Sequence, residues 1–172
     1  MKYLDYNWQL NLLNKAAAYD RLTGGGSLKM FRVVCALNML SPTTTIQING
    51  EEFLAVWDTG AVQTTVGSRV VNRTDLGPIV GESCAYTASA ERIPMKKHRV
   101  KLTLPDGFEI PDFLIQYAPA VDGLPHEVII GMDLISRGRL LIYRTPEGQV
   151  LEFHYDEQDL LSGDLDWQAE VE

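Results

Sequence analysis

The alternation of apolar and polar positions along the chain predicts mostly β-structure. From residue 30 onward, short runs rich in Val, Ile, Leu and Phe are separated by turn residues, which is typical of short strands. The expected strands are 30–40, 43–48, 51–57, 98–104, 109–117, 128–130, 140–143 and 149–155. Many short strands with frequent turns indicate a barrel or a sandwich, and the sequence contains no internal repeat.

Turn residues support three of these assignments. The Asn-Gly pair at 49–50 predicts a tight hairpin between 43–48 and 51–57, because this pair favours the left-handed backbone of a two-residue hairpin turn. Pro-Glu-Gly at 146–148 predicts a last hairpin between 140–143 and 149–155. In the segment 98–104 every second residue is expected on one buried face: His98, Val100, Leu102 and Leu104.

Helical patterns are confined to two places. Leu4, Trp8, Leu12, Ala16 and Tyr19 recur every three or four residues, which predicts an amphipathic helix over 4–22. Thr-Gly-Gly-Gly-Ser at 23–27 ends it as a flexible joint. A short helix is expected at 133–137.

Composition and charge exclude several classes of protein. The 172 residues are 45% apolar and 22% charged, which is typical of one soluble globular domain. The net charge is −8, but residues 156–172 hold seven acids and no Lys or Arg, so the remainder carries only −1. We expect a solvated acidic tail, and no broad basic surface is present for nucleic acid.

Cysteine and histidine usage gives no metal or redox motif. Cys35 and Cys84 are far apart and form no CxxC, so we expect buried free thiols in a reducing compartment. No signal peptide pattern and no apolar run of about 20 residues is present, so we expect a cytoplasmic protein that does not span a membrane. The three histidines are scattered, and neither HExxH nor GxSxG occurs, so neither a metal nor a cofactor is expected.

One short motif is suited to chemistry. Asp58-Thr59-Gly60 follows the apolar strand 51–57, and a carboxylate in such a place must be hydrogen-bonded, paired or used. We expect it at a rigid, nearly dry turn. Gly60 permits a close backbone approach, and the Thr59 hydroxyl can lock the loop. Taken alone, the triplet is also compatible with a plain turn.

A second motif lies about seventy residues downstream, and the two motifs together are more specific than the first one alone. Residues 128–135, VIIGMDLI, form a buried strand, a glycine and the start of a short helix. The order of hairpin, Asp-Thr-Gly-Ala-x-x-Thr, hairpin-rich middle and Ile-Ile-Gly-Met-Asp-Leu-Ile resembles the retropepsins, the retroviral-type aspartic proteases and their bacterial single-domain relatives. The resemblance covers residues 43–155. It implies an all-β, closed barrel-like fold with one short helix after the second motif, in addition to the N-terminal helix expected above.

The resemblance also implies roles for individual residues. Asp58 corresponds to the catalytic aspartate of an endopeptidase that cleaves polypeptides without a cofactor, and the Thr59 hydroxyl to the group that ties two active loops together across a dimer. The residues implied to support the active loop are Gly60, Ala61, Thr64, Ile129, Ile130 and Gly131. The flap that closes over substrate is expected to have its tip at Thr87, Ala88, Ser89 and Ala90. Flap tips of the family usually contain glycine, and this one does not.

A single Asp-Thr-Gly predicts a homodimer. This chemistry needs two carboxylates about 3 Å apart that share a proton. Asp133 has no Thr-Gly after it and is interpreted as a helix N-cap or first-turn acid, so the second acid must come from another copy. Two alternatives remain open: the same dimer could bind an extended peptide with little or no cleavage, which the glycine-free flap favours, or it could be a structural assembly subunit.

Three segments follow from these patterns: an N-terminal helical segment and joint at 1–29, a retropepsin-like domain at 30–155 and an acidic tail at 156–172. The amphipathic segment 4–22 has several possible roles. It could pack on its own barrel, act as a releasable pro-segment, dock over the dimer, or bind another partner.

Overall fold

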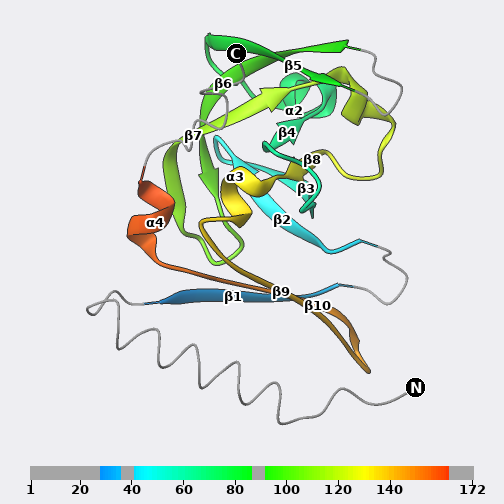
Figure 1. The fold of residues 1–172 in the computed structure, drawn as a ribbon, viewed down its shortest axis with the longest axis vertical. Coiled ribbons are helices and arrows are strands. Elements are labelled where there is room, and N and C mark those ends of the chain that lie inside the picture. Colours follow the sequence, from blue (N-terminus) through cyan, green and yellow to red (C-terminus); the bar gives the residue numbers. More distant parts are fainter. Residues whose placement is uncertain (1–27, 36–40, 87–91, 163–172) are drawn as a thin grey trace.

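The computed structural model describes residues 28–35, 41–86 and 92–162, and the course of the chain is shown in Figure 1. The strands are β1 (Lys29–Cys35), β2 (Thr43–Ile48), β3 (Glu51–Trp57), β4 (Thr65–Val66), β5 (Ile79–Tyr86), β6 (Arg92–Thr103), β7 (Glu109–Tyr117), β8 (Val128–Ile130), β9 (Gly138–Thr145) and β10 (Gly148–Tyr155). The helices are α2 (Ser68–Arg73), the 3₁₀ helix η1 (Pro119–Gly123), α3 (Met132–Ile135) and α4 (Glu157–Leu161).

The larger sheet closes into a barrel. Its strands run in the order β2, β3, β8, β4, β7 and β6, and β2 also pairs with β6, so that these six strands form a closed ring (Figure 1). The β3–β8 and β4–β7 pairs are parallel and the others antiparallel. Strand β5 pairs with β6 and extends the sheet outside the ring. The prediction of a mostly β, closed barrel-like fold is confirmed.

A second, three-stranded sheet in the order β1, β10, β9 lies against the barrel (Figure 1). Its inner face is aromatic: Phe153 packs with its ring centroid 5.0 Å from that of Trp57, and Phe31 lies 5.7 Å from the same tryptophan. Because Trp57 ends β3, this sheet is packed directly beneath the residue that precedes Asp58. The sheet and the end of β3, which leads into Asp58, therefore share one core.

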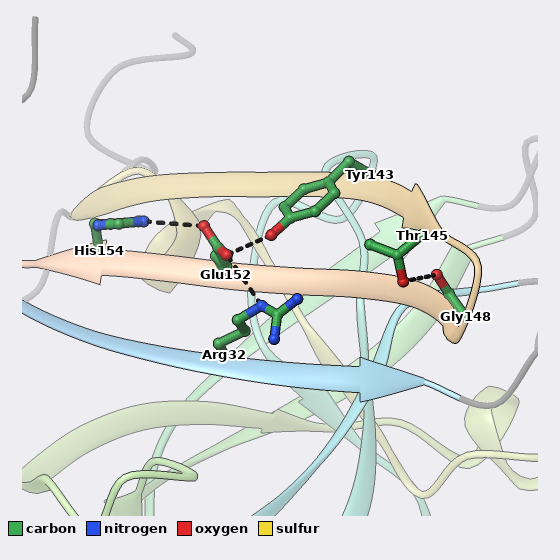
Figure 2. Close-up of polar contacts among 6 residues, drawn as sticks. All are labelled: Arg32, Tyr143, Thr145, Gly148, Glu152 and His154. Atoms are coloured by element: carbon green, nitrogen blue, oxygen red, sulfur yellow. Dashed lines mark hydrogen bonds and ion pairs between the residues drawn. The ribbon is translucent and has the colours of Figure 1, made fainter. Parts of the chain in front are cut away.

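Polar contacts on the outer face of this sheet join all three strands (Figure 2). Glu152 of β10 accepts a hydrogen bond from the Tyr143 hydroxyl of β9 at 2.5 Å, and its Oε1 lies 3.3 Å from Nε of Arg32 on β1. His154 lies 3.5 Å from the second oxygen of the same carboxylate. One carboxylate on the central strand thus connects both neighbouring strands in their observed register.

Most predicted strands are confirmed. Residues 43–48, 51–57, 109–117 and 128–130 match β2, β3, β7 and β8, and Asn49 (φ 51°) and Gly50 (φ 89°) adopt the left-handed backbone that the hairpin turn requires. The predicted inward face of 98–104 is buried. The short helix is α3, which begins and ends earlier than expected. Part of the expected first strand, 36–40, lies outside the described residues.

The structure adds elements that the pattern did not predict: β4, β5, α2, η1 and α4. The last of these lies in the segment expected to be a solvated tail, yet Leu160 within it is completely buried. The predicted helix over 4–22 and the joint at 23–27 lie outside the described residues. In the described ranges, no helix has the length and apolar character needed to cross a membrane.

Candidate active site

The parallel pairing of β3 with β8 brings the two sequence motifs together. Trp57, the last residue of β3, is paired with Ile130, the last residue of β8. The backbone N–H of Asp58 donates to the carbonyl oxygen of Ile130 at 3.0 Å. Two motifs that are about seventy residues apart in sequence are therefore joined by a backbone hydrogen bond at the point where the acid leaves its strand.

The Asp58 carboxylate is oriented by its own loop. Its Oδ1 accepts the backbone N–H of Gly60 at 2.8 Å, and a Cβ added to Gly60 would lie only 3.1 Å from this oxygen. A side chain at position 60 would therefore displace the carboxylate from its present position. Asp58 itself is exposed in the single chain. The expectation of a nearly dry turn is wrong for one protomer, because nothing in its described part covers the carboxylate.

Behind the loop, Thr64 and Asp133 form a buried clasp, the Thr64–Asp133 clasp. The N–H of Thr64 donates to Asp133 Oδ2 and its hydroxyl donates to Oδ1, both at 2.8 Å. The same hydroxyl accepts the N–H of Gly131 at 3.2 Å. Thr64 is completely buried and Asp133 is 7% exposed. Four groups from the two motifs thus satisfy one another away from water.

Backbone contacts hold the second motif against the loop. The N–H of Met132 donates to the carbonyl of Ala61 at 2.8 Å, and that of Asp133 donates to Val62 at 3.1 Å. A Cβ at Gly131 would lie between 2.6 and 2.9 Å from backbone atoms of Gln63, a distance that side chains do not tolerate. Gly131 is therefore fixed by close backbone packing rather than by a left-handed φ angle.

Asp133 does more than the sequence suggested. It lies in the first turn of α3 as expected, but its carboxylate reaches back to Thr64 and holds the loop that follows Asp58. Burial raises its pKa to about 6, while the hydrogen bonds from Thr64 and Leu134 and the charge of Arg137 act in the opposite direction. The sequence signal available was an acid two residues after the glycine that follows a buried strand.

Thr59 borders a shallow apolar hollow on the surface of the protomer. The side chains that line it come from α3 and β9 and include Met132, Ile135, Leu140 and Ile142. Ile142 is 43% exposed, and β9 is an edge strand of the three-stranded sheet in the described part of the chain. An exposed apolar side chain on an unpaired strand edge is a feature of interaction surfaces.

His126, which the sequence analysis left as an ordinary histidine, lies within electrostatic range of Asp58. Burial lowers its pKa, and the charge of Asp58 partly offsets that effect. The next residue, Glu127, fixes this segment: its Oε2 accepts the N–H of Leu54 at 3.1 Å, and its Oε1 pairs with Arg73 at 3.1 Å. The contacts of Glu127 thus anchor the backbone segment that carries His126.

The predicted flap tip lies between two paired strands, β5 and β6. Tyr86 at the end of β5 pairs with Arg92 at the start of β6, so the two arms of a hairpin are formed. The four residues predicted for its tip, Thr87, Ala88, Ser89 and Ala90, lie outside the described residues. Within the described ranges, no group of three or more His, Cys, Asp or Glu could hold a metal ion, and both cysteines are free.

The structure of the chain is similar to a solved structure of a retropepsin-like aspartic protease from Rickettsia conorii. The match has a TM-score of 0.53 and 16% sequence identity, and it covers 76% of this chain and 95% of that one. The chain has the retropepsin fold. A second match, to EIAV protease in complex with an inhibitor, has a TM-score of 0.45, 19% identity and coverage of 59% and 92%, and adds no weight. No protein-family model and no curated protein sequence matches the chain.

Proposed function

We propose that this protein is an aspartic endopeptidase whose active site is shared by two copies of the chain. The observation that carries the proposal is Asp58: an exposed carboxylate in an Asp-Thr-Gly turn, oriented by Gly60 and held from behind by the Thr64–Asp133 clasp. A loop fixed in this way is preorganised for catalysis. The retropepsin fold supports the same reaction class.

The reaction follows from a pair of Asp58 carboxylates that share one proton. The ionised member acts as general base on a water molecule, and the protonated member donates a hydrogen bond to the carbonyl of the scissile peptide. The Gly60 N–H on Oδ1 fixes the plane of each carboxylate, so that the second oxygen is directed toward the water or the substrate. The pair then titrates as one coupled unit with two apparent pKa values.

The second carboxylate is assigned to another copy because one described chain does not provide it. Among the described residues, the Gly60 N–H is the group within hydrogen-bond distance of the Asp58 carboxylate. The hollow beside Thr59 and the open edge of β9 give each copy an apolar surface next to the active loop. Two such surfaces related by a two-fold axis close on each other and bring the loops together.

The test combines an isosteric variant with subunit mixing. Asp58→Asn is expected to abolish cleavage of an unfolded polypeptide at pH 4–6 while its circular dichroism spectrum stays that of the wild type. With equal amounts of both chains and free exchange, about a quarter of the dimers keep both acids. Activity per wild-type chain is then expected to fall to about half. Full activity of the mixture, despite demonstrated exchange, would place the site within one chain.

The glycine-free flap favours one alternative, a dimer of the same form that binds extended peptides without cutting them. In that case wild type and Asp58→Asn would bind an unfolded polypeptide equally well, and neither would release fragments on prolonged incubation.

A further inference from the structure

Arg137, at the junction of α3 and β9, is a buried cation that joins three parts of the fold. It is 9% exposed. Its Nε donates to the carbonyl of Asp133 at 2.8 Å, and its Nη1 donates to the carbonyls of Leu160 and Ser162 at 3.1 and 2.9 Å. Its guanidinium carbon lies 5.8 Å from the ring centroid of Phe113 on the barrel wall.

Burying a guanidinium is costly unless its donors are hydrogen-bonded. These contacts therefore compensate for the cost of burying Arg137. Two of the three acceptors are carbonyls at the end of α4, which have no partner within the helix. The helix lies at the side of the barrel, where Leu160 is completely buried (Figure 1). The segment after β10 is thus anchored by an apolar side chain and by a cation that also contacts α3.

The other end of this connection is the catalytic loop. Arg137 holds the backbone of Asp133, whose carboxylate accepts hydrogen bonds from Thr64 N–H, Thr64 hydroxyl and Leu134 N–H. An ionised carboxylate can accept all three, whereas a protonated one gives up an acceptor position. In the described residues, Arg137 is the charged group that acts on Asp133, and its charge favours the ionised form.

We propose that Arg137 is a positioning residue that couples helix α4 to the Thr64–Asp133 clasp and lowers the pH at which the clasp loses its ionised, fully bonded form. Its catalytic consequence rests on the proposed function, because a shared-proton pair works in acid, where a buried carboxylate is otherwise most easily protonated. Its structural consequence does not depend on that function.

Two readouts test the coupling without any cleavage assay. The first is the pH titration of the Thr64 backbone amide by NMR, which reports protonation of the Asp133 carboxylate bonded to it. The second is hydrogen exchange of the α4 amides. Arg137→Met removes the charge and the donors, and Arg137→Lys keeps the charge but not the planar fork. Arg69→Met, on the exposed face of α2, is the matched control.

In Arg137→Met the Thr64 titration midpoint is expected to move up by roughly half a unit or more, and the Ser162 amide to exchange about tenfold faster. Arg137→Lys is expected to keep the midpoint but lose the exchange protection, and Arg69→Met to change neither. Asp133→Asn should abolish the titration. In active protein, the acid limb of kcat/KM is expected to move upward with the midpoint in Arg137→Met and to return in Arg137→Lys.

An unchanged midpoint in a folded Arg137→Met protein, or unchanged α4 exchange in Arg137→Lys, would overturn the proposal. If Arg137→Met does not fold, Arg137→Gln replaces it as the neutral variant. If the wild type cleaves no polypeptide, the proposed function fails, and the titration and exchange results still decide the role of Arg137.

Discussion

At the scale of single residues, two glycines in the active site serve different purposes. A Cβ at Gly131 would meet the backbone of Gln63 at 2.6–2.9 Å, whereas a Cβ at Gly60 would meet only the Asp58 carboxylate, at 3.1 Å. A backbone neighbour cannot move without disturbing the clasp, but a side chain can rotate. The first glycine is therefore needed for the fold and the second for the orientation of the acid.

Replacing each glycine by alanine separates these purposes. Gly131→Ala is expected to lower the free energy of unfolding by about 2 kcal/mol or more, because the methyl group overpacks a rigid contact. Gly60→Ala is expected to leave stability within about 0.5 kcal/mol while reducing kcat roughly tenfold or more, since it displaces the carboxylate. Urea unfolding and steady-state kinetics measure both. Equal stability losses in the two variants would contradict this assignment.

Asp133 predicts an unusual pH dependence of stability. Its pKa is about 6 in the folded chain and near 3.8 when unfolded. Between these values the folded chain retains a proton that the unfolded chain has lost, so stability falls as pH rises and the full loss, roughly 3 kcal/mol, is reached above pH 6. Asp133→Asn should lack this fall. Urea unfolding from pH 4 to 7 at one protein concentration measures the difference between the two proteins, and parallel curves would contradict it.

The contact of Asp133 with Thr64 is an example of a residue role that could not be predicted from the sequence. Asp58, Thr59 and Gly60 could be singled out because a carboxylate and a glycine after a buried strand are unusual. Asp133 reads equally well as an ordinary first-turn acid, because its partner, Thr64, is 69 residues away in sequence. The pairing of β8 with both β3 and β4 brings them together.

At the scale of elements, a helix or strand could be predicted when its own residues show a clear periodicity or a characteristic turn. The hairpin of β2 and β3 was predictable because its turn requires Asn-Gly and its strands are apolar. The two-residue β4 has too few positions for any periodicity. Strand β5 lies at the edge of the sheet, and its apolar residues Ile79 and Val80 are exposed. The apolar positions in its sequence therefore do not indicate which face is buried. α4 was missed because one buried residue, Leu160, anchors it among acids.

The three-stranded sheet yields a prediction at the same scale. Glu152→Gln removes the charge that pairs with Arg32 and weakens the short hydrogen bond from Tyr143, so it is expected to lower stability by about 1–2 kcal/mol. Glu157→Gln is the matched control, since its pair with Lys29 is 3.5 Å long and roughly half exposed on both sides. We expect less than about 0.5 kcal/mol there. Equal effects in urea unfolding would show that the central carboxylate adds no more than a surface pair.

At the scale of the whole molecule, β1 pairs with β10 along its full length, from Lys29 with Tyr155 to Cys35 with Gln149. The sheet that supports Trp57 and borders the Thr59 hollow therefore cannot form until the chain has been synthesised as far as Tyr155 and has left the ribosome. Contacts of such sequence separation form slowly, because loop closure must precede them. A nascent chain thus lacks the edge strand and the hollow proposed to pair two copies. The proposed two-copy active site is therefore assembled only after β10 has been synthesised, and this timing follows from the topology of the sheet.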